Sequence, residues 1–590
     1  MGRREPLLHS FGLFWMLAAL AGMSLIITLY AVPDALLRLY PFRDQSGYRA
    51  ALDVIEFARP LGFGLVAGAA LAAFYFRDAA RRVRPVTGAL PNVTNTPAAP
   101  GFAGWKWGLL LGLAGVALAL WLLPIGDGLQ DDEADKLRVV VGTWDYWVSN
   151  FFNTRVNILP ITVARLVHVI TATREEWVLR LAVFSVFTAP LLFMWLMPLR
   201  RRYGYLAAAF LLLFFGLHIS MGEYASKVQG YLPVLMFAVL QFVLWTAMLK
   251  RPNGVSPVLG VAWLLACVGG YLTHNFVILF IAAQIGAAFL LDMNARWSGR
   301  GVHRAAAIIV GYGSLLMVVM GVFLLFGLRS VLFHLGLSGD GREIVTVAEG
   351  LEQVLIAMTG NTGWAALAFL LVYGAAFVYI WRTSGRTYRA ELYLALLALT
   401  LVVLCVVIIR PRFFIARFFI WLPMIWLILL SLAAQRVMRQ LLMVRGVARP
   451  LVLAGTCIGL LLAVLPSQIT WQAARTAGVN LRKAAQKAFE VAQTYEATGA
   501  NTGYLLLSSY GNYAHRMWFY LPDEDMVSDR DIDATQALRT ADALDKNVWI
   551  VPAALGQLSG SYAWVKDEAI RTITAGNMTL YVIPEYVIPG

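Results

Sequence analysis

Cysteine and charge are both scarce in this chain. Only three of the 590 residues are cysteines, Cys267, Cys405 and Cys457, and each lies in an apolar stretch far from the others. This spacing excludes a disulfide framework and a cysteine-based metal knuckle. Charged residues make up 14% of the chain, hydrophobic residues make up 59%, and the mean hydropathy is +0.68. Because the apolar residues come in long blocks, the composition excludes an ordinary soluble protein and predicts a multi-spanning membrane protein.

Acidic residues are the minority charge, since 34 Asp and Glu stand against 48 Lys and Arg and give a formal net charge of +14. The basic residues gather in short connections between apolar stretches, such as "RDAARRVR" and "PLRRRYGY". This pattern marks cytoplasmic loops, so we expect a cytoplasmic N-terminus, an external C-terminus and no nucleic-acid partner. The apolar run after "MGRRE" is too long for a signal peptide and predicts an anchor. We expect an integral protein of the bacterial inner (plasma) membrane.

Hydropathy in windows of roughly 19 residues predicts about thirteen transmembrane helices, and therefore a mainly α fold. The predicted spans centre on residues 11–31, 61–76, 105–123, 177–197, 204–221, 230–249, 257–273, 275–292, 305–328, 363–381, 391–409, 413–431 and 450–466.

Composition divides the chain into four parts. The stretch "PVTGALPNVTNTPAAPG" predicts a linker. After residue 466 the sequence turns polar, and the runs "GYLLLSS", "NVWIVP" and "TLYVIP" alternate with helix-like segments, which predicts a small α/β domain. The predicted parts are an N-terminal two-span hairpin, a cytoplasmic linker, a transmembrane core and an external α/β domain, over residues 1–84, 85–104, 105–466 and 467–590.

The first long external loop is expected to contain a surface helix. In "ITVARLVHVI", Val163, Leu166, Val167 and Ile170 follow the i, i+3, i+4, i+7 spacing of an amphipathic helix that can lie on the bilayer surface. The following "TREE", residues 173–176, fits a capping box for the next span.

The same loop begins with carboxylates at a predicted membrane exit. Five acids fall in the nine residues from Asp127 to Asp135, and three of them, Asp131, Asp132 and Glu133, are consecutive. One interpretation is a solvated acidic loop that follows the charge bias between the two sides. The other is a carboxylate held at the membrane surface, where it acts as a general base or binds a cation.

Two further external connections carry ionisable groups. In the hairpin "HISMGEYASKVQGY", Glu223 and Lys227 are four residues apart, the spacing of a simple helical ion pair. In "YLTHNF", His274 stands at a span junction, where it is either a structural hydrogen-bonding group or a functional one.

A fourth cluster is basic on the side where basic residues are otherwise few. In "IIRPRFFIARFFIWLP", Arg410, Arg412 and Arg417 lie on the predicted outer side between two strongly apolar spans. External arginines at the membrane surface favour an anionic ligand, and a lipid phosphate held by two parallel hydrogen bonds fits them.

These four clusters, in this order, resemble the GT-C superfamily of membrane glycosyltransferases, in particular the group of dolichyl-phosphate-mannose-protein mannosyltransferases and aminoarabinose transferases. The resemblance covers about residues 105 to 470. The matching elements are an acidic pair, an Arg-Leu at the start of the next span, a hairpin that ends in tyrosine and a Thr-His element, here Asp132-Glu133, Arg180-Leu181, Tyr231 and Thr273-His274, followed by the late segment "RFFIARFFIWLP".

The chain departs from the family pattern in three places. A lone Pro160 stands where Pro-Pro is often found, Phe418 replaces a tyrosine, and two extra spans precede the usual core.

The resemblance implies an enzyme that moves a sugar from a polyprenyl-phosphate-linked donor to an acceptor hydroxyl on the extracytoplasmic face. The acceptor is a glycan, a lipid or a protein. Asp132 is the expected base, while Asp131 or Glu133 positions it or holds a divalent cation, with Mg²⁺ and Mn²⁺ both open. The residues expected to bind substrate are Arg410, Arg412, Arg417, Lys227, Glu223, Tyr231, His274 and Arg180.

Two other functions fit a polytopic chain. A transporter usually shows paired repeats and Gly/Pro-broken helices at mid-membrane depth, which this sequence does not show. A lipid-linked polysaccharide polymerase or ligase is organised around a large external loop with arginines and histidines. The early acidic pair argues against that alternative.

Overall fold

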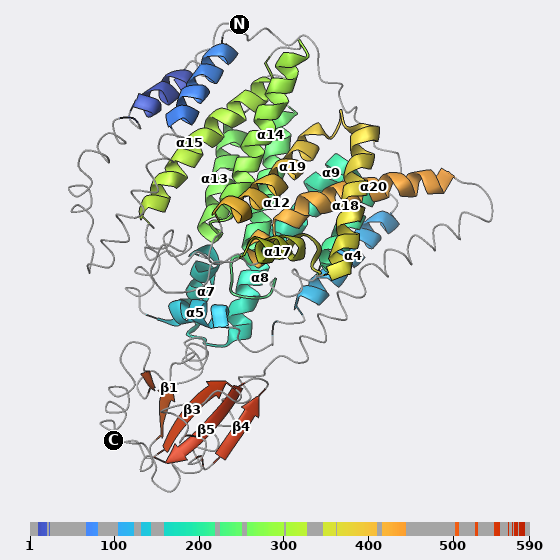
Figure 1. The fold of residues 1–590 in the computed structure, drawn as a ribbon. Coiled ribbons are helices and arrows are strands. Elements are labelled where there is room, and N and C mark those ends of the chain that lie inside the picture. Colours follow the sequence, from blue (N-terminus) through green and yellow to red (C-terminus); the bar gives the residue numbers. More distant parts are fainter. Residues whose placement is uncertain are drawn as a thin grey trace.

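The computed structural model is mainly helical (Figure 1). It describes residues 10–20, 23, 66–80, 104–122, 125, 131–142, 158–218, 225–250, 256–299, 302–326, 346–361, 363–409, 416–443, 502–506, 526–528, 548–554, 565, 569, 571–575 and 578–584.

Most of the described residues belong to apolar helices that pack into one bundle. Their backbone polar groups are paired within each helix, the arrangement that a lipid environment requires. The helices are α4 (Gly104–Leu122), α5 (Asp131–Val141), α7 (Ile158–Thr171), α8 (Glu176–Met194), η2 (Trp195–Leu199), α9 (Arg200–Tyr203), α10 (Tyr205–Leu217), α12 (Tyr231–Leu249), α13 (Pro257–Thr273), α14 (Val277–Trp297), α15 (Arg304–Phe326), α17 (Val347–Thr359), α18 (Gly363–Ser384), α19 (Arg389–Leu404), η3 (Cys405–Ile409), η4 (Ala416–Phe419) and α20 (Leu422–Met443).

Among the described residues, six helices are long and apolar enough to cross a membrane. They are Glu176–Tyr203, Tyr231–Leu249, Val277–Trp297, Gly363–Ser384, Arg389–Val407 and Leu422–Gln440. Each overlaps a predicted span. Shorter apolar helices match further ones, and the predicted span at 450–466 lies outside the described residues, so the total of about thirteen stays a prediction.

Small residues allow the helices to approach closely. A Cβ atom built on Gly269 of α13 would lie 2.4 Å from the Phe237 ring of α12. One built on Gly216 of α10 would lie 2.9 Å from the Cβ of Ala117 in α4. Both distances are shorter than carbon atoms tolerate, so these helix pairs require glycine at their contacts.

The N-terminal helices contact the main bundle directly. The Phe11 ring meets Tyr312 of α15 edge-on at 5.5 Å. The Tyr75 hydroxyl donates to the Asp292 Oδ2 of α14 over 2.6 Å, and Arg296 bridges Asp292 to Asp78. The predicted domain boundary near residue 84 is untested, but the helices before it are joined to the bundle by buried polar contacts.

The first long connection, which was predicted to be external, contains two helices within the described residues. Residues 131–133 form the first turn of α5, and Glu133 is buried, so a solvated loop does not describe Glu133. The surface helix is α7, in which Leu166 and Ile170 are exposed while Ile161, Ala164 and Arg165 are buried. Its apolar exposed face suits the predicted bilayer contact, which stays a prediction.

The predicted capping box at residues 173–176 was wrong. The Thr173 hydroxyl accepts a hydrogen bond from the Glu175 backbone N–H, two residues on, and no side chain caps α8. Such a local turn competes with helix capping. A capping box does occur at α17, between Thr346 and Glu349, where the sequence analysis had expected no helix.

Near the C-terminus, five strands form one sheet of order β2-β1-β3-β5-β4. The parallel pairs are β1–β2 and β1–β3, and the antiparallel pairs are β3–β5 and β4–β5. The strands are β1 (Thr502–Leu506), β2 (Met526–Ser528), β3 (Val548–Ala554), β4 (Arg571–Ala575) and β5 (Met578–Pro584).

The three predicted strand-like runs correspond to β1, β3 and β5. The helix-like segments between them lie outside the described residues, so the α/β domain is described only by its sheet. In Figure 1 the sheet lies beyond the end of the bundle that carries α5 and α7.

Candidate functional site

A buried carboxylate stands at the centre of the predicted site. Glu133, in the first turn of α5, has no exposed surface. Its Oε1 accepts from the Nε of Arg180 over 2.8 Å, and its Oε2 accepts from the Nη2 over 2.6 Å. The backbone N–H of Val228 donates to Oε1 over 2.9 Å. Three segments that are far apart in sequence therefore meet at one side chain, and a two-pronged guanidinium–carboxylate pair fixes their geometry.

The charge around Glu133 keeps it ionised. Burial alone would raise the pKa of this carboxyl, but the charge and hydrogen bonds of Arg180, together with Lys227 and Val228, outweigh burial and lower the pKa below its usual value. A carboxylate with a lowered pKa and both oxygens bonded is a poor proton acceptor. Of the three consecutive acids, Glu133 is therefore suited to holding the site in place.

Arg180 also fixes the chain that enters α5. Its Nη1 donates to the backbone carbonyl of Ile125 over 2.9 Å. At the other end of α5, the Nη1 of Arg165 in α7 donates to the carbonyls of Val139, Val140 and Gly142 over 2.8 to 3.1 Å. These carbonyls have no partner within the helix, and a cation is favourable beside them. The acidic segment is thus held at both ends.

The hairpin 225–230 joins this ion pair to an aromatic cluster. Lys227 and Val228 act on Glu133, and the hairpin leads directly into Tyr231 at the start of α12. The Tyr231 and His274 rings lie 6.1 Å apart between centroids, and His274 and Phe418 lie 4.9 Å apart. Described residues from each of the four sequence clusters are therefore linked by contacts.

The aromatic cluster is extended by residues that the sequence analysis did not single out. Phe276 stacks on Phe418 with centroids 5.4 Å apart and an interplanar angle of 15°. The backbone N–H of Ala416 donates to the Gln353 side chain of α17 over 2.9 Å, which anchors η4 to that helix. Phe418, which replaces the tyrosine of the family pattern, is thus held between the Thr-His element and α17.

Several predicted site residues are only partly described or not described. The backbones of Asp131 and Asp132 lie in α5 and that of Arg417 lies in η4, without a description of their side chains. Three other predicted site residues, Glu223, Arg410 and Arg412, lie outside the described residues. The roles of all these residues stay predictions.

The sequence analysis missed buried polar groups near the same hairpin. Ser226 and Gln229 are 1% and 2% exposed, and their side-chain polar atoms have no hydrogen-bond partner among the described residues. His218, at the end of α10, is buried as well. Their sequence signal was their location in a connection that was predicted to be external.

A divalent cation finds no preformed site among the described residues. No group of three or more His, Cys, Asp or Glu side chains converges within the described ranges. Both oxygens of Glu133 are engaged by Arg180 and Val228, so Glu133 does not fit a ligand role. A cation site would depend on Asp131 and Asp132.

No family model and no curated protein sequence matches the chain. Among solved structures, the fold is similar to that of ArnT from Cupriavidus metallidurans, determined bound to undecaprenyl phosphate. The TM-score is 0.51 at 15% sequence identity, and the alignment covers 83% of this chain and all of the ArnT chain. At this identity the likeness shows the fold alone, which is similar to that of ArnT.

Proposed function

We propose that this protein is a GT-C-type glycosyltransferase that uses a polyprenyl-phosphate sugar donor. The observation that supports the proposal is a continuous set of contacts that runs from Glu133 and Arg180 through the hairpin 225–230 and Tyr231 to His274 and Phe418. The fold likeness to ArnT, whose structure holds undecaprenyl phosphate, supports a lipid-linked donor.

The proposed reaction needs a proton acceptor and an anion-binding group. The carboxylate of Asp132 takes the proton from the acceptor hydroxyl. At the same time the oxygen of that hydroxyl forms a bond to the anomeric carbon of the donor sugar. The bond between that carbon and the donor's phosphate oxygen breaks, and the electron pair leaves on the polyprenyl phosphate. Arg410, Arg412, Arg417 and Lys227 are proposed to bind this phosphate, since a departing anion is stabilised by positioned cations.

In this proposal the ion pair of Glu133 and Arg180 is a brace. It fixes the first turn of α5, which carries Asp132, against the start of α8. A general base must lie within hydrogen-bond reach of the acceptor, and a loose turn would lose that geometry. Glu133 would then affect transfer without touching the substrate.

The experiment compares Asp132→Asn with Asp131→Asn, using a lipid-linked donor and the purified full-length protein. Loss of the base should lower transfer by about 10² to 10⁴-fold while binding of polyprenyl phosphate is kept. Asp135→Asn, in the same helix, is the matched control and should transfer normally. The large loss of transfer should occur in one of the two variants, and the residue replaced in that variant is the base. Normal transfer in both would remove the acidic motif from the mechanism.

The donor phosphate site has its own test. Arg417→Ala removes a charge-assisted contact worth about 1.5 to 3 kcal/mol, so the apparent donor affinity should fall by about ten- to a hundredfold. Arg410→Ala should act in the same direction. If both variants use the donor at wild-type affinity, the phosphate is bound elsewhere.

The extracytoplasmic location of the site is also proposed. In cells, cysteine labels at Gly128 and Ser528 should react from outside, while a label at Ser298, which follows α14, should react only after permeabilisation. Cys267 and Cys405 are buried and give a low background. External labelling at position 298 of intact cells would contradict the orientation.

A further inference from the structure

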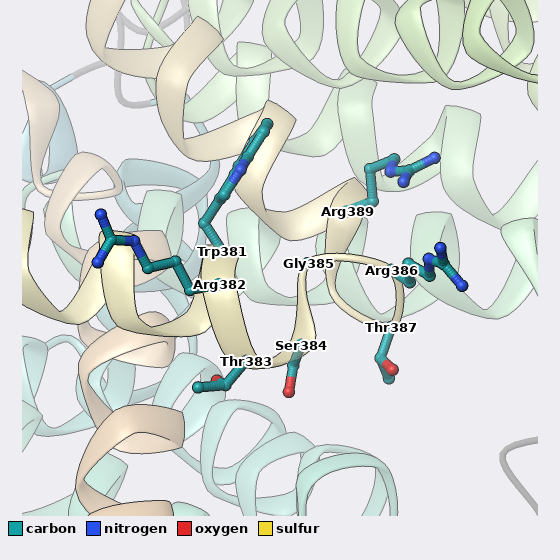
Figure 2. Close-up of a pocket in the computed structure, with 8 residues that line it drawn as sticks. All are labelled: Trp381, Arg382, Thr383, Ser384, Gly385, Arg386, Thr387 and Arg389. Carbon is teal, nitrogen blue, oxygen red and sulfur yellow. The ribbon is translucent and has the colours of Figure 1, made fainter.

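The turn between α18 and α19 contains a cavity of about 380 Å³ that the proposed reaction does not use. Figure 2 shows its lining. The lining residues are Trp381, Arg382, Thr383, Ser384, Gly385, Arg386, Thr387 and Arg389.

This cavity lies at the far end of the bundle from the candidate site. Both α17, before α18, and η3, at the end of α19, pack near η4 and its Phe418. The helix α18 has 22 residues and is therefore about 33 Å long, which separates the turn from the site by most of a membrane. The two sites would be independent, and the inference does not depend on the proposed function.

Among the described residues, the lining of the cavity is cationic. It contains three arginines and no carboxylate. The nearest acid along the chain, Glu391, is fully buried and bonded to Arg202 and Tyr203. Arg382 and Arg386 are exposed and make no ion pair with the described residues. Strongly charged walls without counter-charge favour a bound anion.

A fourth guanidinium holds the turn in shape. Arg436 of α20 donates from Nη1 to the Thr383 hydroxyl over 3.0 Å, and its guanidinium lies 5.9 Å from the Tyr388 ring centroid. The backbone of Gly385 approaches the Trp381 carbonyl so closely that an added Cβ would lie 2.4 Å from it. The cavity is therefore built by packed segments.

Exposed tryptophans indicate the level of this turn in a bilayer. Trp364 and Trp381, at the two ends of α18, are 85% and 48% exposed, and Leu371 between them is 67% exposed. Seventeen residues of helix separate the tryptophans by about 25 Å, close to the thickness of a hydrocarbon core. Tryptophans favour the headgroup level. Arg382 directly follows the second one, so the cavity opens among lipid headgroups.

We propose that this cavity binds the headgroup of an anionic phospholipid in the leaflet opposite the candidate site. Basic pockets between membrane helices suit such headgroups. In Figure 2, Arg382 lies on one side of the turn, Arg386 and Arg389 lie on the other, and the hydroxyls of Thr383, Ser384 and Thr387 lie between them. The exposed apolar residues Leu371, Val372 and Val378 of α18 could contact the acyl chains of such a lipid, whereas a free phosphate would leave them without a ligand contact.

The test measures phosphatidylglycerol binding to the full-length protein in neutral detergent by native mass spectrometry. Arg382→Gln/Arg386→Gln should weaken the apparent affinity by about tenfold or more, since two charge-assisted contacts are lost. The control Arg77→Gln/Arg201→Gln also removes two exposed arginines and should change affinity less than about twofold. Equal weakening in both doubles would mean diffuse charge attraction and would overturn the proposal.

Two further arms separate the remaining outcomes. Arg382→Lys/Arg386→Lys should restore part of the affinity, and thermal unfolding of every variant shows whether a loss reflects misfolding. Phosphatidylcholine should not compete. Inorganic phosphate should compete only at far higher concentration than phosphatidylglycerol, and if it competes equally well, the site is one for a free anion and the lipid assignment is wrong.

Discussion

Two buried glutamates, Glu133 and Glu391, mark the two ends of one helical span. Their partners, Arg180 and Arg202, both belong to the 28-residue span Glu176–Tyr203. Neither carboxylate is exposed to solvent. At Glu133 the donors are shared between both oxygens. At Glu391 the Arg202 and Tyr203 donors all meet Oε1, and Oε2 is buried without a partner among the described residues.

The difference shows that the contribution of a buried ion pair depends on whether both carboxylate oxygens accept hydrogen bonds. Desolvation can cancel the attraction of a buried pair, so burial alone says little about stability. Glu133 is fully bonded and holds together α5, α8 and the hairpin 225–230, which makes it suited to keeping a site in register. Within the described part of the chain, the hydrogen bonds of Glu391 join α9 to α19, and its Oε2 has no partner.

The largest expected effect is that of Arg180→Ala. It leaves the buried Glu133 unpaired and should lower the free energy of unfolding by about 3 to 5 kcal/mol. Transfer per folded molecule should fall too, because the first turn of α5 loses its brace. Calorimetry and transfer assays on the folded fraction measure the two effects. A variant that is destabilised but transfers normally would show that Glu133 has no part in positioning the site.

Arg202→Ala is the matched change at the other end of the span. It should destabilise by about 3 kcal/mol, at the lower end of the range, since Tyr203 still donates to Glu391. Transfer per folded molecule should be unchanged, because no site residue contacts this pair within the described part of the chain. If Arg202→Ala lowered transfer as much as Arg180→Ala does, the two ion pairs would not differ in their effect on the site.

A pair of amide variants sharpens the comparison further. In Glu133→Gln, the new amide group must face a donor from Arg180 or Val228, so a buried hydrogen bond is lost along with the charge. In Glu391→Gln, the amide can take the side of the unpartnered Oε2. Glu133→Gln should therefore cost at least about 1 kcal/mol more than Glu391→Gln. Equal unfolding free energies would mean that Oε2 has a partner.

The smallest expected effect is a pH dependence at Glu133. Its pKa is lower in the folded protein than in the unfolded chain, so its contribution is complete above the unfolded value and is lost as pH falls through the folded one. The stability difference between wild type and Glu133→Gln should be constant near neutral pH and shrink below about pH 4.3. Unfolding at a series of pH values measures it. If the stability difference between wild type and Glu133→Gln grew on acidification, the pKa of Glu133 would be raised in the folded protein and not lowered.

The sequence predicts the apolar spans well and the pairing between segments poorly. Hydropathy located α12, α14 and α18 because lipid selects apolar runs, whatever their neighbours. The pairing of Glu133 with Arg180 spans 47 positions, and no periodicity links residues that far apart. The order of the sequence motifs predicted that Glu133 and Arg180 belong to the same site. It did not predict that they form an ion pair with each other.

Other features depended on contacts that no local pattern contains. The Arg165 side chain caps α5 from a different helix, a contact between residues 25 apart that the spacing of apolar residues in α7 does not contain. Ser226 and Gln229 look like ordinary hairpin residues, and only their burial makes them notable. The helix α17 was missed because its 13 residues are fewer than a membrane span needs, although its Thr346 and Glu349 fit a capping box.

The clamping of α5 at both ends has a consequence for how the protein is made. An 11-residue helix with an acidic first turn is marginal by itself in water. Arg165 and Arg180 follow it in the chain, so α5 leaves the ribosome before either partner exists. A lone carboxylate cannot be buried cheaply, so Glu133 stays hydrated until α8 has been inserted. The acidic turn therefore takes its final place only after α8 has been made, and a chain stalled before residue 180 lacks it.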